Sequence, residues 1–172
     1  MIERTLAIIK PDAWPKHGGE ILTMATEAGL VPVEVRVLRL PVAEDGVFVR
    51  DFGWVKSEGF GFRSWSHFYA EHEGKPFFKP LVEFMASGPV LVMVLSGDHA
   101  ISHWRELMGP TDSRKARPDT VRGRFGAHYT EKSVETTFHA VLDPYPMWRN
   151  AVHGSDSPEA AAREIAFFFG DA

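Results

Sequence analysis

Short apolar stretches of the chain have the pattern of β-strands. Residues 6–9 (LAII) form a continuous apolar run, typical of a strand that is covered on both faces, and Lys10 follows at its end. Residues 90–95 (VLVMVL) give the clearest buried strand. Between residues 31 and 40, valines alternate with charged residues, which predicts a half-buried strand.

Other stretches have the spacing of amphipathic helices. Apolar positions recur at helical spacing over residues 20–28, 77–86 and 99–108, and a glycine stands at or near the end of each stretch. Residues 131–142 are a candidate for an additional helix. Ser157 begins a final helix, because serine is a good N-cap and the proline after it suits the first turn.

The order of these elements predicts an α+β fold. Strands and helices alternate along the chain, and a short strand before the final helix completes the set. This order is that of a ferredoxin-like β-α-β-β-α-β core, an antiparallel sheet with helices packed on one face. Residues 41–67 and the polar stretch from 110 to 125 interrupt the pattern and are predicted to be irregular.

Composition limits the fold and the partners. At 172 residues and 44% hydrophobic, residues 1–172 are expected to form a single domain with its own core. The formal net charge of -4 gives no general attraction for nucleic acid, so a polyanion must be held by a local cluster. The sequence has no cysteine, and neither a leader peptide nor a membrane-spanning run is visible. We therefore expect a soluble, cytoplasmic protein that binds neither membrane nor nucleic acid.

The candidate catalytic residue is His153, which precedes the final helix. Glu164 lies on that helix and can fold back toward the imidazole, as the third group of a nucleophilic site does. The alternative is a structural histidine at the end of a strand. The segment NAVHGSDS at residues 150–157 resembles the active-site signature of the nucleoside diphosphate kinases, in which an asparagine stands three residues before a histidine followed by Gly-Ser-Asp.

The resemblance to this family extends over most of the chain. Similar segments occur in the family's order at residues 4–13 (RTLAIIKPDA), 75–78 (KPFF), 87–90 (SGPV), 107–112 (LMGPTD) and 120–123 (TVRG). The resemblance implies a Mg²⁺-dependent phosphotransferase. Such an enzyme moves the γ-phosphate of a nucleoside triphosphate to a nucleoside diphosphate through a phosphohistidine, here at His153, with ping-pong kinetics.

The resemblance also implies roles for individual residues. The family's phosphate-binding positions surround His153 and Glu164 and fall on Lys10, Tyr69, Arg105, Thr111, Arg122 and Asn150, of which Lys10 and Asn150 also count as catalytic. Cations, hydroxyls and an amide suit a diphosphate or triphosphate. Phe77, with Leu81 beside it, matches the ring on which the base stacks, and core packing is the alternative for Phe77. Magnesium is expected to be carried mainly by the nucleotide phosphates, with Asp156 as a candidate ligand.

Other motifs point less clearly to a site. His99 and His103 stand at metal-pair spacing on a predicted helix, but no third ligand follows from the sequence, and a solvated helix face is the simpler interpretation. The segment GFGF at 59–62 lacks the residues of a phosphate-binding loop. A basic cluster is most simply the rim of the phosphate site, with nonspecific nucleic-acid contact as the alternative; its members are Lys115, Arg117, Arg122 and Arg124.

Two stretches depart from the family's compact pattern and are interpreted as inserts, at about residues 44–66 and about residues 126–148. Both flank the expected nucleotide cleft, and the second lengthens a loop that makes subunit contacts in the family's hexamers. We expect a homo-oligomer, either a hexamer or a smaller assembly. The aromatic residues of these stretches are expected to pack together or in a subunit contact, with a lid over the nucleotide as the alternative. They are Trp54, Phe60, Phe62, Trp65, Tyr145 and Trp148.

Two other functions stay open at this point. One is a nucleotide-binding regulatory protein without turnover, and the other is a phosphohistidine donor to other proteins. Each family catalytic position carries the expected residue type, which favours the phosphate-exchanging enzyme.

Overall fold

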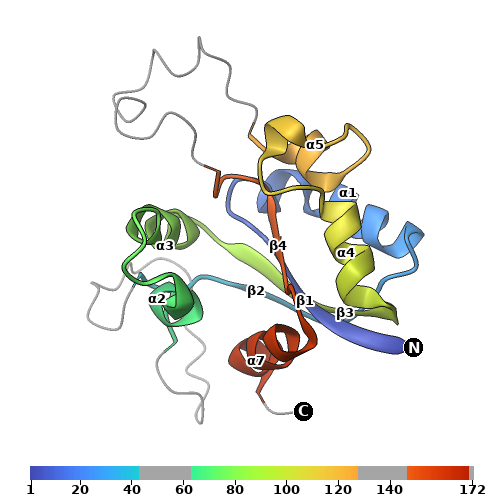
Figure 1. Cartoon of the computed structure of the whole chain (residues 1–172), viewed down its shortest axis with the longest axis horizontal. Helices are drawn as coiled ribbons and strands as arrows, with labels where there is room; N and C mark the ends of the chain where they lie inside the picture. The colour runs from blue at the N-terminus through green and yellow to red at the C-terminus, as the bar shows by residue number, and fades with distance from the viewer. Residues whose placement is uncertain (43–62, 128–146, 171–172) are drawn as a thin grey trace.

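The computed structural model describes residues 1–42, 63–127 and 147–170. The strands within these residues are β1 (Ile2–Ile9), β2 (Val31–Leu38), β3 (Val90–Asp98) and β4 (Val152–Gly154). They form one sheet in the order β2-β3-β1-β4, and each neighbouring pair is antiparallel (Figure 1). In this order β3 lies between β1 and β2, and β1 lies between β3 and β4. The predicted ferredoxin-like fold is therefore confirmed.

Helices cover both faces of the sheet (Figure 1). The helices within the described residues are α1 (Trp14–Glu27), α2 (Trp65–Phe68), α3 (Phe78–Ala86), α4 (Ala100–Met108), α5 (Val121–Phe125) and α7 (Pro158–Phe169). The crossover helices α1 and α4 pack with Ile9 and Met93 on one face. Helices α2, α3 and α7 pack with Ile8 and Val92 on the other. The prediction that helices cover one face only is wrong, because the central strands are apolar on both faces and both must be shielded from water.

Helix α1 begins earlier than the predicted start at residue 20. Its first turn contains Pro15, in a position where the missing backbone N–H does not break a helical hydrogen bond. Gly18 and Gly19 then interrupt the apolar spacing in the sequence. Gly18 is nevertheless required by packing, because a Cβ there would lie 2.5 Å from the ring of Trp14. The start of α1 was thus missed because a glycine, and not an apolar side chain, makes this contact.

Helix α5 lies in a stretch that the sequence predicted to be irregular. The Thr120 hydroxyl caps it by accepting a hydrogen bond from the backbone N–H of Gly123 at 3.1 Å. The helix has five residues, which is too short to show a periodic pattern. It brings Arg122 into a buried position beside the sheet.

Strand β2 occurs where the valine alternation predicted it, but its valines are not buried. Val31, Val33, Val35 and Val37 are 57%, 50%, 49% and 56% exposed. The strand lies at the edge of the sheet, and an irregularity between Pro32 and Glu34 shifts its register against β3. In a single copy of the chain, the prediction of a half-buried strand is therefore wrong. The alternation of valines shows that one face of the strand is apolar, but it does not show what covers that face.

The helix predicted to follow His153 is present as α7. The Ser157 hydroxyl accepts a hydrogen bond from the backbone N–H of Ala160 at 3.1 Å, and Pro158 occupies the first turn. The helix packs through Ile165 and Phe168 against the sheet, so Glu164 is buried beside β4. The sequence signals for this helix are confirmed.

Several predictions fall outside the described residues. These are the helix at 131–142, most of both inserts and the aromatic residues Trp54, Phe60, Phe62 and Tyr145. Of the other aromatics, Trp65 is fully buried and Trp148 packs against the same core cluster. Among the helices that the structure describes, none has the length and apolar character needed to cross a membrane.

Candidate active site

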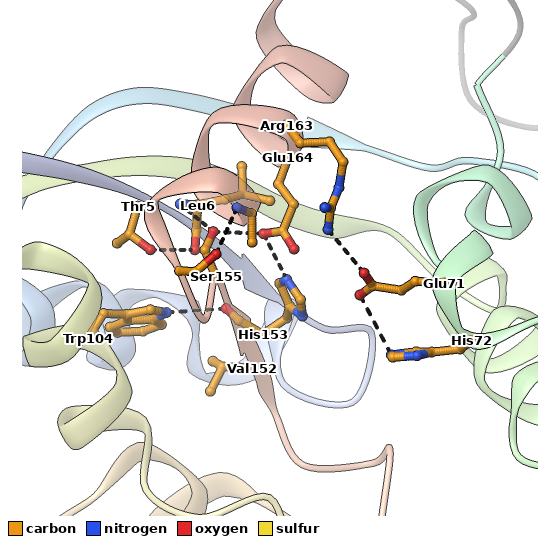
Figure 2. A network of polar contacts seen from close by, with 12 residues as sticks. Thr5, Leu6, Glu71, His72, Trp104, Val152, His153, Ser155, Arg163 and Glu164 are labelled. Atoms are coloured by element: carbon orange, nitrogen blue, oxygen red, sulfur yellow. Dashed lines mark hydrogen bonds and ion pairs between the residues drawn. The ribbon is translucent and has the colours of Figure 1, made fainter. Parts of the chain in front are cut away.

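His153 lies in β4, opposite Ile8 of β1, and its ring is oriented by Glu164 of α7. The imidazole Nε2 is 3.1 Å from Oε2 of Glu164. The Ser155 hydroxyl donates to the same oxygen at 2.7 Å. Figure 2 shows the Glu164 carboxylate pointing toward both side chains. A carboxylate that meets two donors from neighbouring positions holds the imidazole in one orientation.

The charge of Glu164 determines which imidazole nitrogen is free. Burial, the largest influence, raises its pKa, but the hydrogen bonds from His153 and Ser155, together with the charges of His153 and Arg163, outweigh burial, and the net pKa is lowered. Glu164 is therefore a carboxylate near neutral pH and accepts a proton-bearing Nε2. The other nitrogen, Nδ1, then carries the lone pair. The geometry thus leaves Nδ1 with a lone pair that no described residue uses, and the His153 side chain is 21% exposed, so a ligand can reach it.

Aromatic side chains enclose the His153 ring. Phe68 and Tyr69 meet it edge to face, with ring centroids 5.4 and 6.0 Å away. The indole Nε1 of Trp104 donates to the backbone oxygen of His153 at 3.2 Å. Gly154 permits this approach, because a Cβ there would lie 2.4 Å from the indole. The ring and the backbone of His153 are thus both held in place.

Lys10 and Asn150 form a second polar group in the site. The Lys10 ammonium donates to Oδ1 of Asn150 at 2.7 Å and to the backbone oxygen of Trp148 at 2.9 Å. The Asn150 amide donates in turn to the backbone oxygen of Thr111 at 3.0 Å. Lys10 is 5% exposed. Burial first, and the charge of Arg122 second, lower its pKa to about 7.

Ala151 connects this group to His153 through an unusual backbone conformation. Its φ of 68° lies in the left-handed region, which is rare for a residue with a Cβ. The backbone N–H of Val152 donates to the Asn150 oxygen at 2.8 Å, which closes a γ-turn around Ala151. Such a conformation costs about 1–3 kcal/mol and persists only where neighbouring contacts impose it. Asp12 provides one of those contacts, because its Oδ2 accepts the Ala151 N–H at 3.2 Å.

Two buried donors in the site have no hydrogen-bond partner among the described residues. They are the Tyr69 hydroxyl and Nε of Arg122. The remaining Arg122 nitrogens donate to the backbone oxygens of Gly109 and Val152, at 2.9 and 3.0 Å. Burial first, and the charge of Arg105 second, lower the Arg122 pKa to about 10. Burial also raises the pKa of Tyr69, so its hydroxyl keeps its proton. Buried donors of this kind suit an anion.

Phe77, one of the two residues predicted to contact the base, lies at the end of a row of rings that starts at His153. Tyr69 stacks on His72 with ring centroids 6.0 Å apart, and His72 meets Phe77 at 5.4 Å. Phe77 is 39% exposed, and the Lys75 ammonium lies 5.7 Å from its ring centroid. Leu81 is buried in the core cluster of α2, α3 and α7. The core-packing alternative therefore describes Leu81 better than it describes Phe77.

The remaining predicted residues are at the surface. Arg105 of α4, Thr111 and Asp156 are exposed. The basic cluster is partly neutralised, since Arg117 pairs with Asp119 at 3.0 Å. The rings of His99 and His103 have centroids 6.4 Å apart, yet in the described part of the chain no group of three metal-ligand residues could hold an ion. Four residues of the site were missed by the sequence analysis: Ser155, Asp12, Phe68 and Trp104. Ser155 and Asp12 lie within the motifs that match the family, and those motifs could have identified them.

Comparison with known proteins shows where this arrangement belongs. The family model described as nucleoside diphosphate kinase matches residues 61–172. A nucleoside diphosphate kinase of Psychromonas ingrahamii is 41% identical over 171 residues, which cover 99% of this chain and 92% of that one. The chain belongs to the nucleoside diphosphate kinase family. The resemblance inferred from the sequence is thus confirmed.

Solved nucleoside diphosphate kinases share the fold. The Aquifex aeolicus enzyme is 36% identical with a TM-score of 0.72, over 98% of this chain and 96% of that one. The Halobacterium salinarum enzyme, solved in complex with CDP, is 34% identical with a TM-score of 0.73, over 99% of this chain and 90% of that one.

Membership of the nucleoside diphosphate kinase family defines the reaction. The enzyme is a phosphotransferase that moves the γ-phosphate of a nucleoside triphosphate to a nucleoside diphosphate. The transfer is ping-pong and passes through a phosphohistidine. A divalent metal ion is required for catalysis in this family.

Proposed function

We propose that His153 carries the phosphoryl group on Nδ1. The observation that supports this assignment is the contact of Nε2 with the Glu164 carboxylate, which leaves Nδ1 with the lone pair. Nδ1 attacks the γ-phosphorus, the bond to the β–γ bridging oxygen breaks, and the nucleoside diphosphate leaves with that electron pair. A β-phosphate oxygen of a second diphosphate then attacks the same phosphorus and regenerates the imidazole. Glu164 stabilises the positive charge that the ring acquires in between.

The phosphates are held, in this proposal, by the residues around the two unpartnered donors. The Tyr69 hydroxyl and Nε of Arg122 offer hydrogen bonds that no described residue uses. The family's remaining positions, Lys10, Arg105, Thr111 and Asn150, add cations, a hydroxyl and an amide to the same site. In phosphoryl transfer the protein mainly positions groups and stabilises charge, and fixed donors of this kind do both.

The base is proposed to stack on Phe77 and to make few hydrogen bonds. The exposed ring of Phe77 supports this, because a base can reach it from solvent. A stacked base is accepted whatever its identity, whereas a base bound by hydrogen bonds would be selected. Leu81 is buried in the core and contributes only apolar packing to this part of the site.

Exchanging Phe77 for alanine tests the stacking proposal. We expect KM to rise by about fivefold to a hundredfold for ATP, GTP and CDP alike, because stacking on an aromatic ring contributes about 1–3 kcal/mol per base. The matched control is Lys79→Gln, on the exposed surface of α3. A rise confined to one base, or no rise, contradicts the proposal.

We propose Mg²⁺ as the divalent ion. Within residues 1–42, 63–127 and 147–170 no cluster of three carboxylates or histidines could hold a metal ion, which fits a hydrated ion carried by nucleotide phosphates. The exposed Asp156, three residues after His153, is the protein carboxylate proposed to contact it. When bound, the ion neutralises charge on the phosphate oxygens. Asp156→Asn should raise the Mg²⁺ concentration needed for half-maximal activity, whereas Glu159→Gln, in the first turn of α7, should not.

We propose further that the enzyme is a homo-oligomer and acts in the cytoplasm. The exposed valines of β2 support self-association, since they form an apolar surface at a sheet edge that no other described strand pairs with. A sequence without cysteine suits a reducing compartment.

Labelling with ATP tests the proposed intermediate. Incubation with γ-labelled ATP and Mg²⁺ should give a covalent label that is labile in acid, stable in base and discharged by GDP. Peptide mapping should place it on residue His153. An absence of label supports a nucleotide-binding protein without turnover, and a label on another histidine contradicts the assignment.

A further inference from the structure

Ala151 is held in its left-handed conformation from both sides by the segment that follows β1. The backbone N–H of Lys10 donates to the Ala151 oxygen at 2.8 Å. The carboxylate of Asp12 accepts the Ala151 N–H at 3.2 Å. Both polar backbone groups of Ala151 are thus bound by residues that lie far away in the sequence, and Ala151 itself is fully buried.

The γ-turn at Ala151 orients the groups on either side of it. Asn150 precedes the turn, and its amide links Lys10 to the Thr111 backbone. Val152 follows the turn, and its backbone oxygen accepts a hydrogen bond from Arg122. His153 is the next residue. A change of φ at Ala151 would therefore move Asn150 relative to His153 and weaken the contacts of both with their partners.

Asp12 occupies this position at a cost in stability. Its Oδ1 is buried and has no hydrogen-bond partner among the described residues. Burial, the largest influence, raises the pKa of the Asp12 carboxyl, although the charge of Lys10 opposes this. A buried carboxylate with one unpartnered oxygen is destabilising, so its presence here calls for an explanation other than stability.

We propose that Asp12 is a positioning residue that acts through the Ala151 N–H. Its hydrogen bond keeps the γ-turn in the left-handed region, so that Asn150 and His153 face the same phosphate group. In this role Asp12 acts through the backbone of Ala151 and not through a direct contact with the reacting atoms. The role rests on the proposed function of His153, because it is defined by the geometry of that site.

Glycine at position 151 separates this role from general stabilisation. Glycine adopts a positive φ without steric strain, so a turn with glycine does not need Asp12 to impose the conformation. We therefore expect Asp12→Ala to lower kcat/KM by about tenfold or more, which is the loss of one well-placed hydrogen bond. Ala151→Gly alone should stay near the parent, and Asp12→Ala combined with Ala151→Gly should recover most of the lost activity.

The variant Asp12→Asn distinguishes the hydrogen bond from the charge. Asparagine keeps an acceptor oxygen but removes the negative charge that faces Lys10. It should stay within about threefold of the parent if the hydrogen bond is what matters. A loss as large as that of Asp12→Ala would show that Asp12 acts by tuning Lys10 and would overturn the proposal.

The result that contradicts the proposal most directly is a loss in Asp12→Ala that glycine at 151 does not reduce. Full activity of Asp12→Ala contradicts it as well. If Asp12→Ala does not fold, Asp12→Ser takes its place in the same comparison, because the serine hydroxyl is too short to reach the Ala151 N–H. Labelling of the parent protein by γ-labelled ATP separates a failure of the proposed function from a failure of the role of Asp12. An unlabelled parent contradicts the proposed function and this role together, whereas a labelled parent with an unaffected Asp12→Ala contradicts the role alone.

Discussion

At the scale of single residues, the state of Lys10 is the most informative. Its lowered pKa of about 7 means that the ligand-free protein loses this charge just above neutral pH. In the unfolded chain the proton stays bound up to about 10.5. The unfolded chain therefore binds more protons than the folded protein between these values, and folding stability should rise with pH across that window.

Nucleotide binding should reverse the shift at Lys10. A polyphosphate beside the ammonium favours its charged form, so binding at pH 8.5 should take up nearly one proton, and binding at pH 6 should take up almost none at this site. Calorimetry in two buffers of different ionisation enthalpy measures this uptake. Lys79→Gln, on an exposed surface, should match the parent, and Lys10→Gln should lose the uptake at pH 8.5. A parent without uptake at pH 8.5 contradicts the interpretation.

Glu164 gives a second prediction at this scale. Glutamine keeps an acceptor for Nε2 but cannot stabilise the charged imidazole ring. Charge-assisted hydrogen bonds contribute about 1.5–3 kcal/mol, so Glu164→Gln should slow phosphorylation of His153 by about tenfold to a hundredfold. Single-turnover quench measurements follow this step directly. Glu159→Gln, exposed on the same helix, is the control, and equal rates in both variants would argue against a role for the carboxylate.

At the scale of helices and strands, the sequence correctly predicted the elements that depend on residues close to one another in the chain. The apolar runs at 6–9 and 90–95 lie in β1 and β3, and Ser157 caps α7 as expected. The first turns of α1 were missed because a glycine makes its packing contact. Helix α5 was missed because five residues show no period.

Gly154 shows how an element depends on one small residue. A Cβ at this position would lie 2.4 Å from the ring of Trp104, which is fully buried and cannot move aside. Gly154→Ala should lower the free energy of unfolding by about 1–3 kcal/mol and slow the phosphorylation of His153, because β4 is displaced. Gly19→Ala is the control, since nothing lies within 4 Å of its added Cβ. Denaturant unfolding compares the two, and equal stability contradicts the prediction.

At the scale of the whole molecule, the unburied valines of β2 predict self-association. Half-exposed valines at a sheet edge are unfavourable in water and suit a second copy of the chain. Sedimentation should give a mass several times the 19.3 kDa of one chain. Val35→Glu combined with Val37→Lys should shift the mass toward the monomer, whereas Ile2→Gln, exposed at the start of β1, should not. A parent that sediments as a monomer contradicts the proposal.

The site as a whole was only partly predictable from the sequence. His153 and its partner Glu164 lie on one short strand–helix unit, so helix signals and a motif were enough to pair them. Asp12 and Ala151 lie 139 residues apart, and only the folded sheet brings them together. The unpartnered state of the Tyr69 hydroxyl is likewise a property of packing that no residue pattern reveals.

The central claim is that one imidazole accepts and returns the phosphoryl group, and His153→Gln tests it most directly. The steady-state rate of phosphate exchange between ATP and GDP in the presence of Mg²⁺ should fall to the detection limit in His153→Gln. The variant should still bind ATP and should keep the thermal stability of the parent. Exchange by His153→Gln at the rate of the parent would contradict the account, because another group would then have to carry the phosphate.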